Sequence, residues 1–452
     1  MLIYFHQANQ CLLKYLILTF LGIFKSISPQ NFFQGIESKL LPLEYCISVI
    51  SLLNSIKPNI YKDNIMRDFR RTFNNYQNIR FQNLAIYNFI RETNNDNQKL
   101  NKPDKMMFSS YLLKCKLNGA HLFGLKKAKL IEINKQIEDL KKEFNENVST
   151  SSSKFALQIH DLKVINSLPD DLLLMTGDNL SVRITLHNHI YSRFMEFCPN
   201  QSLRYQTWCA FNNRASILND IKTSNSITID TLRSLRRDVA NLVGYDTYAQ
   251  YCLDTKMPSS VESIKDSLNL LHSKTRTKFE KDMKELKAFA DKNNLIETQE
   301  LQPWDTNFLR RRILKAKYKN KTDVVQYFTI DSALKGLFSF CENLFNIKIE
   351  QVAQNSFDTW NENVKLFRIY SEDKFLGSFY FDPFQHHPSR KLELSTPQVI
   401  EIIKKSEQFK TKPISVLLFN AKPTLPNQVL QLQMSQVVQL FKAVSRSFLV
   451  II

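Results

Sequence analysis

The sequence has 452 residues, of which 43% are hydrophobic and 23% are charged, and this balance excludes a largely disordered chain. The 61 Lys and Arg against 43 Asp and Glu give a net charge of +18, but the basic residues are scattered among acidic ones without a basic block or zinc-finger spacing. We therefore expect no nucleic-acid partner and keep basic nucleic-acid binding only as a third hypothesis. With only 8 Gly, the chain favours long helices over tight turns.

Residues 1–36 form an apolar and basic N-terminal segment without acidic residues. Its most apolar run, at 15–24, lies between Lys14 and Lys25 and is too short to span a membrane as a helix. The run suits the core of a signal peptide, yet no small-residue cleavage site follows, and the Arg typical of mitochondrial presequences is lacking. The alternatives are a targeting segment, a buried first helix and an imperfect start of the chain. No stable membrane span is expected.

Residues 37–190 are predicted to be an N-terminal helical region. Within it, apolar residues repeat every three or four positions from Leu130 to Phe144, which is typical of a helix with one buried face. Glu138 and Lys142 add a favourable i,i+4 pair to that helix. The β-branched run LSVRITLHNHIYSRF, at 180–194, indicates a short strand.

Helices are predicted to resume over 202–252. Ser259 and Glu262 have the spacing of a capping box, so we expect another long helix to begin there. That helix carries an apolar stripe composed of Ile264, Leu268, Leu271, Phe279, Met283 and Leu286. After a break around LQPWDTNFLRRRI, further helical sequence runs through LFSFCENLFNI.

Two later stretches are predicted to be extended. Residues 365–384 show two apolar alternations around a polar turn, which indicates a β-hairpin that ends at 382–384, and ISVLLFN at 414–420 is typical of a strand. The predicted fold class is therefore mainly α with a small β-sheet. Large aromatic residues in this part of the chain are predicted to belong to the core, namely Trp304, Phe379 and Phe441.

The residue pattern alone assigns no catalytic, metal-binding or cofactor-binding residue. No phosphate-binding loop, dinucleotide fingerprint, serine nucleophile elbow or H-E-x-x-H motif is present. His187 and His189 are two apart in a predicted extended stretch and would face one side, but no third ligand is evident nearby. His386 and His387 are adjacent and would point to opposite faces of an extended segment. Seven dispersed cysteines without a CxxC are typical of reduced structural thiols in a reducing compartment.

Several stretches, taken together, resemble the thimet oligopeptidase and neurolysin family of zinc metallopeptidases. They follow the family's order across residues 110–441, and the mitochondrial intermediate peptidases are a near relative and the alternative branch. The stretches are NGAHLFGLKKAKLIEINKQIEDLKKEFNENVS, SVRITLHNHIYSRFMEFCPNQSLRYQTWCAFNNRAS, LRSLRRDVANLVGYDTYAQYCLDTKM, PWD at 303–305, YFTIDSALKGL and TWNENVKLFRIYSEDKFLGSFYFDPF.

In that family, the segment resembling 414–441 leads into a helix that carries H-E-F-G-H. Two His at i and i+4 hold Zn²⁺, and the Glu activates the metal-bound water. Here Lys442, Ala443 and Arg446 stand at the positions of the first His, the Glu and the second His. Since Lys and Arg are cationic at pH 7 and offer no lone pair, they cannot replace His. The helical pattern is expected to end after Phe441, which leaves 442–452 as a divergent tail.

The resemblance implies a neurolysin-like two-lobed helical fold whose C-terminal part is missing, with 191–441 as the proximal part of the metallopeptidase domain. It also implies zinc as cofactor, although the zinc ligands are absent from this chain, and hydrolysis of short unfolded peptides in a deep channel. We expect the chain of 452 residues to be inactive and to arise from an alternative transcript, a pseudogene or a gene-model error. The alternative is a non-catalytic remnant that binds peptides or a full-length paralogue. The expected location is the cytoplasm, with the mitochondrion as the alternative.

Overall fold

The computed structural model describes residues 29–57, 80–95, 101–177, 180–258, 260–317, 327–384, 397–406, 410–421, 430–432 and 434–451. These residues are mainly helical with two small β-sheets, which confirms the predicted fold class. They form two compact units, one made of residues 109–317 and one made of the described residues up to Phe108 and from Tyr327 onward. The predicted boundaries after residues 36, 190 and 441 stay predictions. Within the ranges given above, no helix is both long and apolar enough to cross a membrane.

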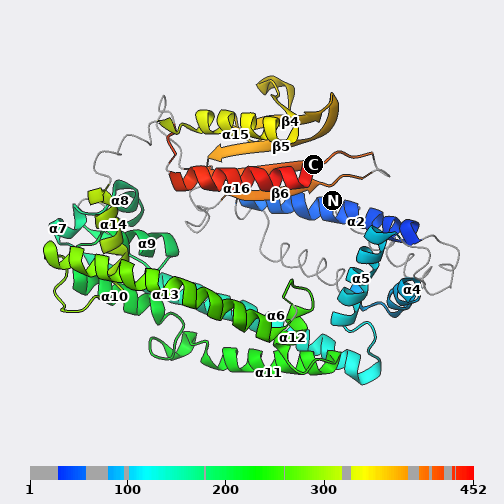
Figure 1. Ribbon diagram of the computed structural model, residues 1–452, viewed down its shortest axis with the longest axis horizontal. Helices are drawn as coiled ribbons and strands as arrows, with labels where there is room; N and C mark the ends of the chain where they lie inside the picture. Colours follow the sequence, from blue (N-terminus) through cyan, green and yellow to red (C-terminus); the bar gives the residue numbers. More distant parts are fainter. Residues whose placement is uncertain are drawn as a thin grey trace. The chain divides into compact units, whose positions relative to one another are not determined.

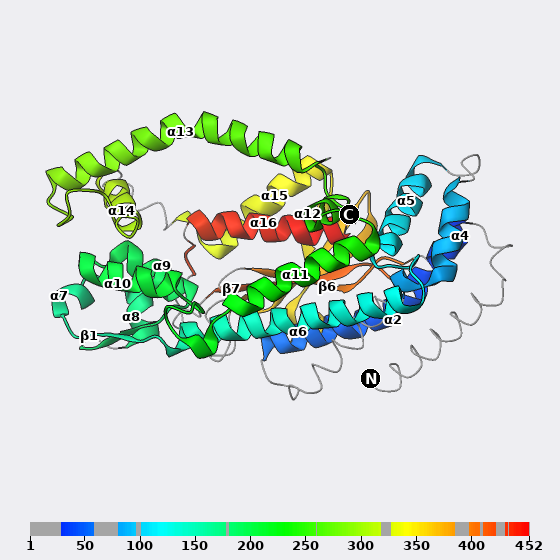
Figure 2. The ribbon, with the colours of Figure 1, turned by 90° about the horizontal axis from the view of Figure 1, so that it is seen from below.

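The unit of residues 109–317 is built almost entirely of helices. Its α6 and α11 pack along one another (Figure 2) through a cluster that joins Leu130, Ile133 and Ile137 to Val239 and Val243. The helix predicted from Leu130 to Phe144 is thereby confirmed. The helices are α6 (Gly124–Lys154), α7 (Leu162–Ile165), α8 (Asp170–Thr176), α9 (Asn188–Phe197), α10 (Gln201–Asn212), η2 (Ile221–Thr223), α11 (Ser226–Val243), α12 (Tyr248–Leu253), α13 (Val261–Lys292) and α14 (Thr306–Lys317), and α5 (Lys102–Leu117) leads into the unit.

A two-stranded antiparallel sheet of β1 (Leu157–Ile159) and β2 (Val182–Ile184) lies in the same unit. Val182 and Ile184 are fully buried against α9, so the predicted short strand is confirmed. The strand ends before the two histidines that follow it. His187 is the N-cap of α9 and His189 lies in its first turn, so the prediction that both lie in an extended stretch and face one side is wrong.

The N-cap of helix α13 lies one residue after the predicted one, so the helix begins one residue later than predicted. The side chain of Ser260, rather than Ser259, accepts a hydrogen bond from the Ser263 amide at 3.1 Å, and Ser259 lies outside the described residues. The apolar stripe of this helix is largely exposed, with Leu271 at 59% and Phe279 at 55%. Only Ala290 of the helix is fully buried, because α13 packs mainly on α12 and α14 near its two ends.

The second unit contains a five-stranded sheet with the order β3-β4-β5-β7-β6. Its strands are β3 (Lys348–Gln351), β4 (Lys365–Ser371), β5 (Lys374–Phe384), β6 (Gln398–Ile403) and β7 (Ile414–Ala421). Strands β5 and β7 are parallel, and the other pairs are antiparallel. The hairpin of β4 and β5 turns at Glu372 and Asp373, whose φ values of 49° and 63° suit a tight two-residue turn. The predictions of this hairpin, its end at 382–384 and the strand at 414–420 are confirmed, whereas β3 and β6 were not predicted.

Helices cover both faces of this sheet. Helices α15 (Ile330–Phe345) and α16 (Met434–Ile451) lie beside the strands of this sheet (Figure 1). On one face they pack on Leu417 and Phe419 of β7 and on Phe379 of β5. Phe379 is fully buried, which confirms it as a core residue. On the other face, α2 (Pro29–Ile56) packs through Leu52 against Val416 and Leu418. Alternate residues of β7 therefore face opposite layers, as the pleat requires. The remaining elements are α4 (Leu84–Asn95) and η4 (Gln354–Ser356).

Candidate active-site helix

Helix α16 carries the three positions at which the resemblance places a metal-binding motif, and it continues well past them. Its buried residues recur every three or four positions and face the sheet: Val437, Leu440, Ala443, Val444, Ser447, Phe448 and Ile451. The prediction that the helical pattern ends after Phe441 is therefore wrong. Small residues at 443 and 447 let the helix approach the sheet, and the β-branched and aromatic residues around them fill the space between the two layers.

The opposite side of α16 faces outward. Lys442 and Arg446, one helical turn apart, are both exposed, and Val438 and Leu449 beside them are 46% and 83% exposed. Phe441 is 39% exposed, so the prediction that it is a core residue is wrong. It stands about 100° around the helix from Leu440, which is fully buried, and therefore lies at the edge of the packed face.

The chemistry of this helix does not fit zinc. The ammonium of Lys442 and the guanidinium of Arg446 are cationic at pH 7 and present no lone pair to a metal ion. Ala443, where the resemblance places the family's Glu, is 4% exposed and has no group that accepts a proton. Within the part of the chain that the structure describes, no three His, Cys, Asp or Glu residues lie close enough together to hold a metal. His386 and His387 lie outside the described residues.

No disulfide joins the cysteines of the described ranges, which are Cys46, Cys115, Cys198, Cys209, Cys252 and Cys341. Cys198 is fully buried, and this burial raises its pKa to about 11, so it is a thiol rather than a nucleophilic thiolate at neutral pH. It packs in the cluster that joins α9 to β2, which is a structural position.

Two of the family-like stretches meet at a buried ion pair. Arg204 of α10 and Asp305 of the PWD sequence are both 0% exposed, and the guanidinium lies 2.6 Å from the carboxylate. Arg204 also donates to the Cys198 carbonyl at 2.8 Å, and Gln201 donates to Asp305 at 2.8 Å. The guanidinium lies over the Phe308 ring, 4.4 Å from its centre. These bonds join the start of α10 to the start of α14.

A further contact joins the two ends of a single family-like stretch, residues 359–384, at the end of the central strand β5. The indole of Trp360 donates to the carboxylate of Asp382 at 2.8 Å, and Asp382 is 1% exposed at the end of β5. Trp304, predicted to be a core residue, is half-buried and packs against Trp208 with ring centres 5.4 Å apart. No role was predicted for Arg204, Asp305 or Asp382 from the sequence. The buried positions of Asp305 and Asp382 could have been predicted from their neighbours, because each aspartate follows apolar or aromatic residues, in PWD and in FYFDPF.

Comparison with known proteins supports the resemblance. Residues 194–447 match the family model "Peptidase family M3", so positions 442, 443 and 446 fall inside the match. The chain is 31% identical over 328 residues to an organellar oligopeptidase A (chloroplastic/mitochondrial) of Arabidopsis thaliana, covering 69% of this chain and 41% of that protein. It is 27% identical over 355 residues to oligopeptidase A of Salmonella typhimurium, covering 76% of this chain and 52% of that protein.

A mitochondrial intermediate peptidase of Eremothecium gossypii is 25% identical over 277 residues, which cover 58% of this chain and 35% of that protein. The chain thus spans about half, or less, of the length of these curated relatives.

Proposed function

The chain belongs to peptidase family M3, which confirms the predicted resemblance, and on that premise we propose that it derives from a zinc metalloendopeptidase of short peptides but does not itself hydrolyse them. The family is one of peptide-hydrolysing metallopeptidases for which zinc is expected. One observation carries the proposal of inactivity. Lys442 and Arg446 occupy the outer face of α16, at the two positions where the family's motif has zinc-ligating His.

The proposal is tested by measuring zinc content and peptidase activity on the same purified chain. After dialysis against zinc and removal of the excess, we expect substoichiometric zinc by elemental analysis and no turnover of a quenched oligopeptide. An intact M3 oligopeptidase treated in parallel provides the positive control. Turnover that a chelator abolishes would show that metal ligands exist elsewhere in the chain, and the proposal would then be wrong.

A second function, a non-catalytic module that binds peptides or a full-length paralogue, is favoured by the outer face of α16. There Val438 and Leu449 expose apolar surface beside the two cations Lys442 and Arg446. Exposed apolar surface of this kind is typical of a contact site. Co-expression with an intact family member, followed by affinity purification of either chain, distinguishes the two functions. Co-purification that Leu449→Ser removes would support the binding function.

We propose the cytoplasm as the location, with the mitochondrion as the alternative. The names of the similar proteins include both compartments, as in "Probable cytosolic oligopeptidase A" and the mitochondrial intermediate peptidases. Imaging of the chain with a C-terminal fluorescent tag tests the proposal, because that tag leaves the apolar N-terminal segment free.

A further inference from the structure

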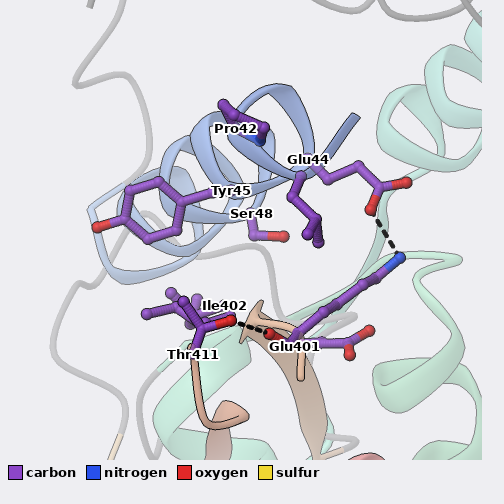
Figure 3. A pocket seen from close by; sticks show the side chains of 10 residues that line it. Pro42, Glu44, Tyr45, Ser48, Glu401, Ile402 and Thr411 are labelled. Carbon is purple, nitrogen blue, oxygen red and sulfur yellow. Dashed lines mark hydrogen bonds and ion pairs between the residues drawn. The ribbon is translucent and has the colours of Figure 1, made fainter. Parts of the chain in front are cut away.

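A cavity of about 270 Å³ lies between α2 and the end of β6, within the sheet-containing unit (Figure 3). The Lys404 ammonium in its wall is already paired with the Glu44 carboxylate at 2.8 Å. The register of β6 places Glu401 opposite Ser415, on the face of the sheet away from α2. The charges of this cavity therefore do not select a ligand. The middle of α13, in the helical unit, differs from it in this respect.

The apolar stripe of α13 is exposed along the middle turns of the helix. α13 packs on α12 and α14 near its two ends (Figure 2), and every residue from 265 to 281 is exposed. Leu268, Leu271 and Phe279 each leave more than half of their surface uncovered. At about 100° per residue, these three side chains lie within about 80° of one another around the helix axis. A stripe this narrow is typical of a seam between two helices.

Lysines stand along both edges of this stripe. Lys274 and Lys281 lie about 60–80° to one side of Leu271 around the helix axis. Lys265 lies on the other side, about 40° beyond Phe279. Within the described residues, no carboxylate pairs with any of these three lysines. Their charge is therefore available to a partner.

The carboxylates of α13 do not offset that charge at the stripe. Between residues 263 and 279 the sequence has one, Asp266, which stands about 160° around the helix from Leu268. The carboxylates that follow, up to Asp291, all take part in ion pairs, as Glu280 does with Arg276 at 2.6 Å. The exposed stripe is thus an apolar surface with excess positive charge at both edges.

We propose that this stripe is the docking site of an acidic amphipathic helix from a partner protein. The apolar side of the partner helix packs on Leu268, Leu271 and Phe279, and its Asp and Glu side chains lie beside the lysines at the two edges. The stripe from Leu268 to Phe279 is about 16 Å long at 1.5 Å per residue, which matches three turns of a partner helix. The site is independent of the proposed function, because it uses no residue of α16 and involves no hydrolysis.

The charge of the stripe favours this occupant over two others. A second copy of the chain would bring the same lysines to the contact, and like charges repel one another. Binding to a lipid bilayer grows with the apolar area that is buried, and three large apolar side chains provide little. An acidic helix meets both the apolar stripe and its cationic edges.

Two fluorescein-labelled helical peptides of three heptads test the proposal by fluorescence anisotropy on the full chain. Both carry Leu at positions a and d, and they differ only in having Glu or Lys at positions e and g. We expect the Glu peptide to bind at least about tenfold more tightly than the Lys peptide at about 0.05 M NaCl. This difference should shrink at about 0.5 M NaCl, because salt screens exposed charges.

Equal affinity for the two peptides, or no binding of the Glu peptide at about 0.1 mM, would overturn the proposal. Two further results would also overturn it. One is binding to vesicles of phosphatidylcholine and phosphatidylserine but not to the Glu peptide. The other is a dimer in sedimentation that Leu271→Ser converts to monomer, since the stripe would then contact a second copy.

Lys274→Glu combined with Lys281→Glu is the charge variant, because it reverses one edge and leaves the apolar stripe intact. We expect its affinity for the Glu peptide to fall at least about tenfold. Lys126→Glu with Lys129→Glu is the matched control, since it changes the net charge equally at exposed positions of α6 and should leave the affinity unchanged. Equal losses in the two double variants, or an undiminished affinity in Lys274→Glu with Lys281→Glu, would overturn the proposal. Circular dichroism checks that these exposed substitutions keep the fold, and the comparison of peptides on the unaltered chain does not depend on it.

Discussion

At the scale of single residues, Arg204 and Asp305 show how a charged motif residue can serve the fold alone. Both are 0% exposed, Gln201 donates a hydrogen bond to Asp305, and Arg204 donates one to the Cys198 carbonyl. A buried charge is tolerated only where its partner is present. Removing one member leaves the other unpaired in an apolar interior, and the cost should then appear as lost stability rather than lost chemistry.

We expect Arg204→Met to lower the free energy of unfolding by about 3–5 kcal/mol, measured by urea denaturation. Arg233→Met is the control, because Arg233 pairs with Asp230 on the surface, where the two side chains are 78% and 77% exposed. Such an exposed pair contributes roughly 0–1 kcal/mol. Similar losses for the two variants would show that the Arg204 pair is not the enclosed contact described above.

Position 443 is a second test at this scale. Ala443 is buried against the sheet, so Ala443→Glu would force a carboxylate into an apolar layer and should destabilise the protein by about 2–5 kcal/mol. Ser445→Glu is the matched control, because Ser445 is exposed on the same helix, and we expect a change within about 0.5 kcal/mol. Thermal unfolding followed by circular dichroism measures both. If Ala443→Glu were as stable as the unaltered chain, position 443 would have to face solvent.

At the scale of elements, sequence patterns located those helices and strands whose own residues fix their conformation. The period of α6 and the polar turn of the β4–β5 hairpin are local signals, and both elements are present. β6 was not predicted because its sequence, QVIEII, lacks the alternation of apolar and polar residues that marks a half-buried strand. Its residues are all half-buried, as expected where β7 covers one edge and helices pack on both faces. For α13 the helix was predicted, but the burial of its apolar stripe was not, because a helical period does not show whether another element covers the apolar face.

The tail after Phe441 was misinterpreted for a physical reason. Val444, Phe448 and Ile451 keep the three- and four-residue spacing of a helix, but they are β-branched or aromatic, and Ala443 and Ser447 interrupt the apolar stripe. Tertiary packing on the sheet outweighs the weak helix propensity of these residues. The sequence and the resemblance show only which residues stand at 442, 443 and 446, where the family's motif is expected. That Lys442 and Arg446 face outward is seen only in the structure.

The junction of β5, β7 and α16 leads to a prediction at the same scale. A Cβ added to Gly377 would stand 2.7 Å from the Pro413 carbonyl oxygen and 2.9 Å from Cγ2 of Ile451, so Gly377→Ala has to displace backbone or the end of α16. We expect a loss of about 1–3 kcal/mol in the free energy of unfolding, measured in urea.

Gly336→Ala provides the opposite control, because nothing lies within 4 Å of its added Cβ in the exposed part of α15. Alanine is the better helix former, so this variant should gain about 0.5–1 kcal/mol. A neutral Gly377→Ala would mean that α16 does not approach β5 as closely as described.

At the scale of the whole molecule, the helical unit encloses its own contacts. The clusters around α6 and α11, around β2 and α9, and around α13 and α14 all lie between residues 109 and 317. So does the buried pair of Arg204 and Asp305. A segment whose core and buried charges are satisfied internally meets the requirement for folding alone.

We therefore expect a fragment of residues 102–317, which keeps α5 and α14 whole, to fold as a helical monomer with one cooperative urea transition. Asp305→Asn should lower the midpoint of that transition in the fragment as much as in the full chain, because the partners of Asp305 are all retained. Circular dichroism and sedimentation measure helicity and mass. A fragment without a cooperative transition, or one in which Asp305→Asn has no effect, would show that the unit depends on residues outside 102–317 and that its core is not closed.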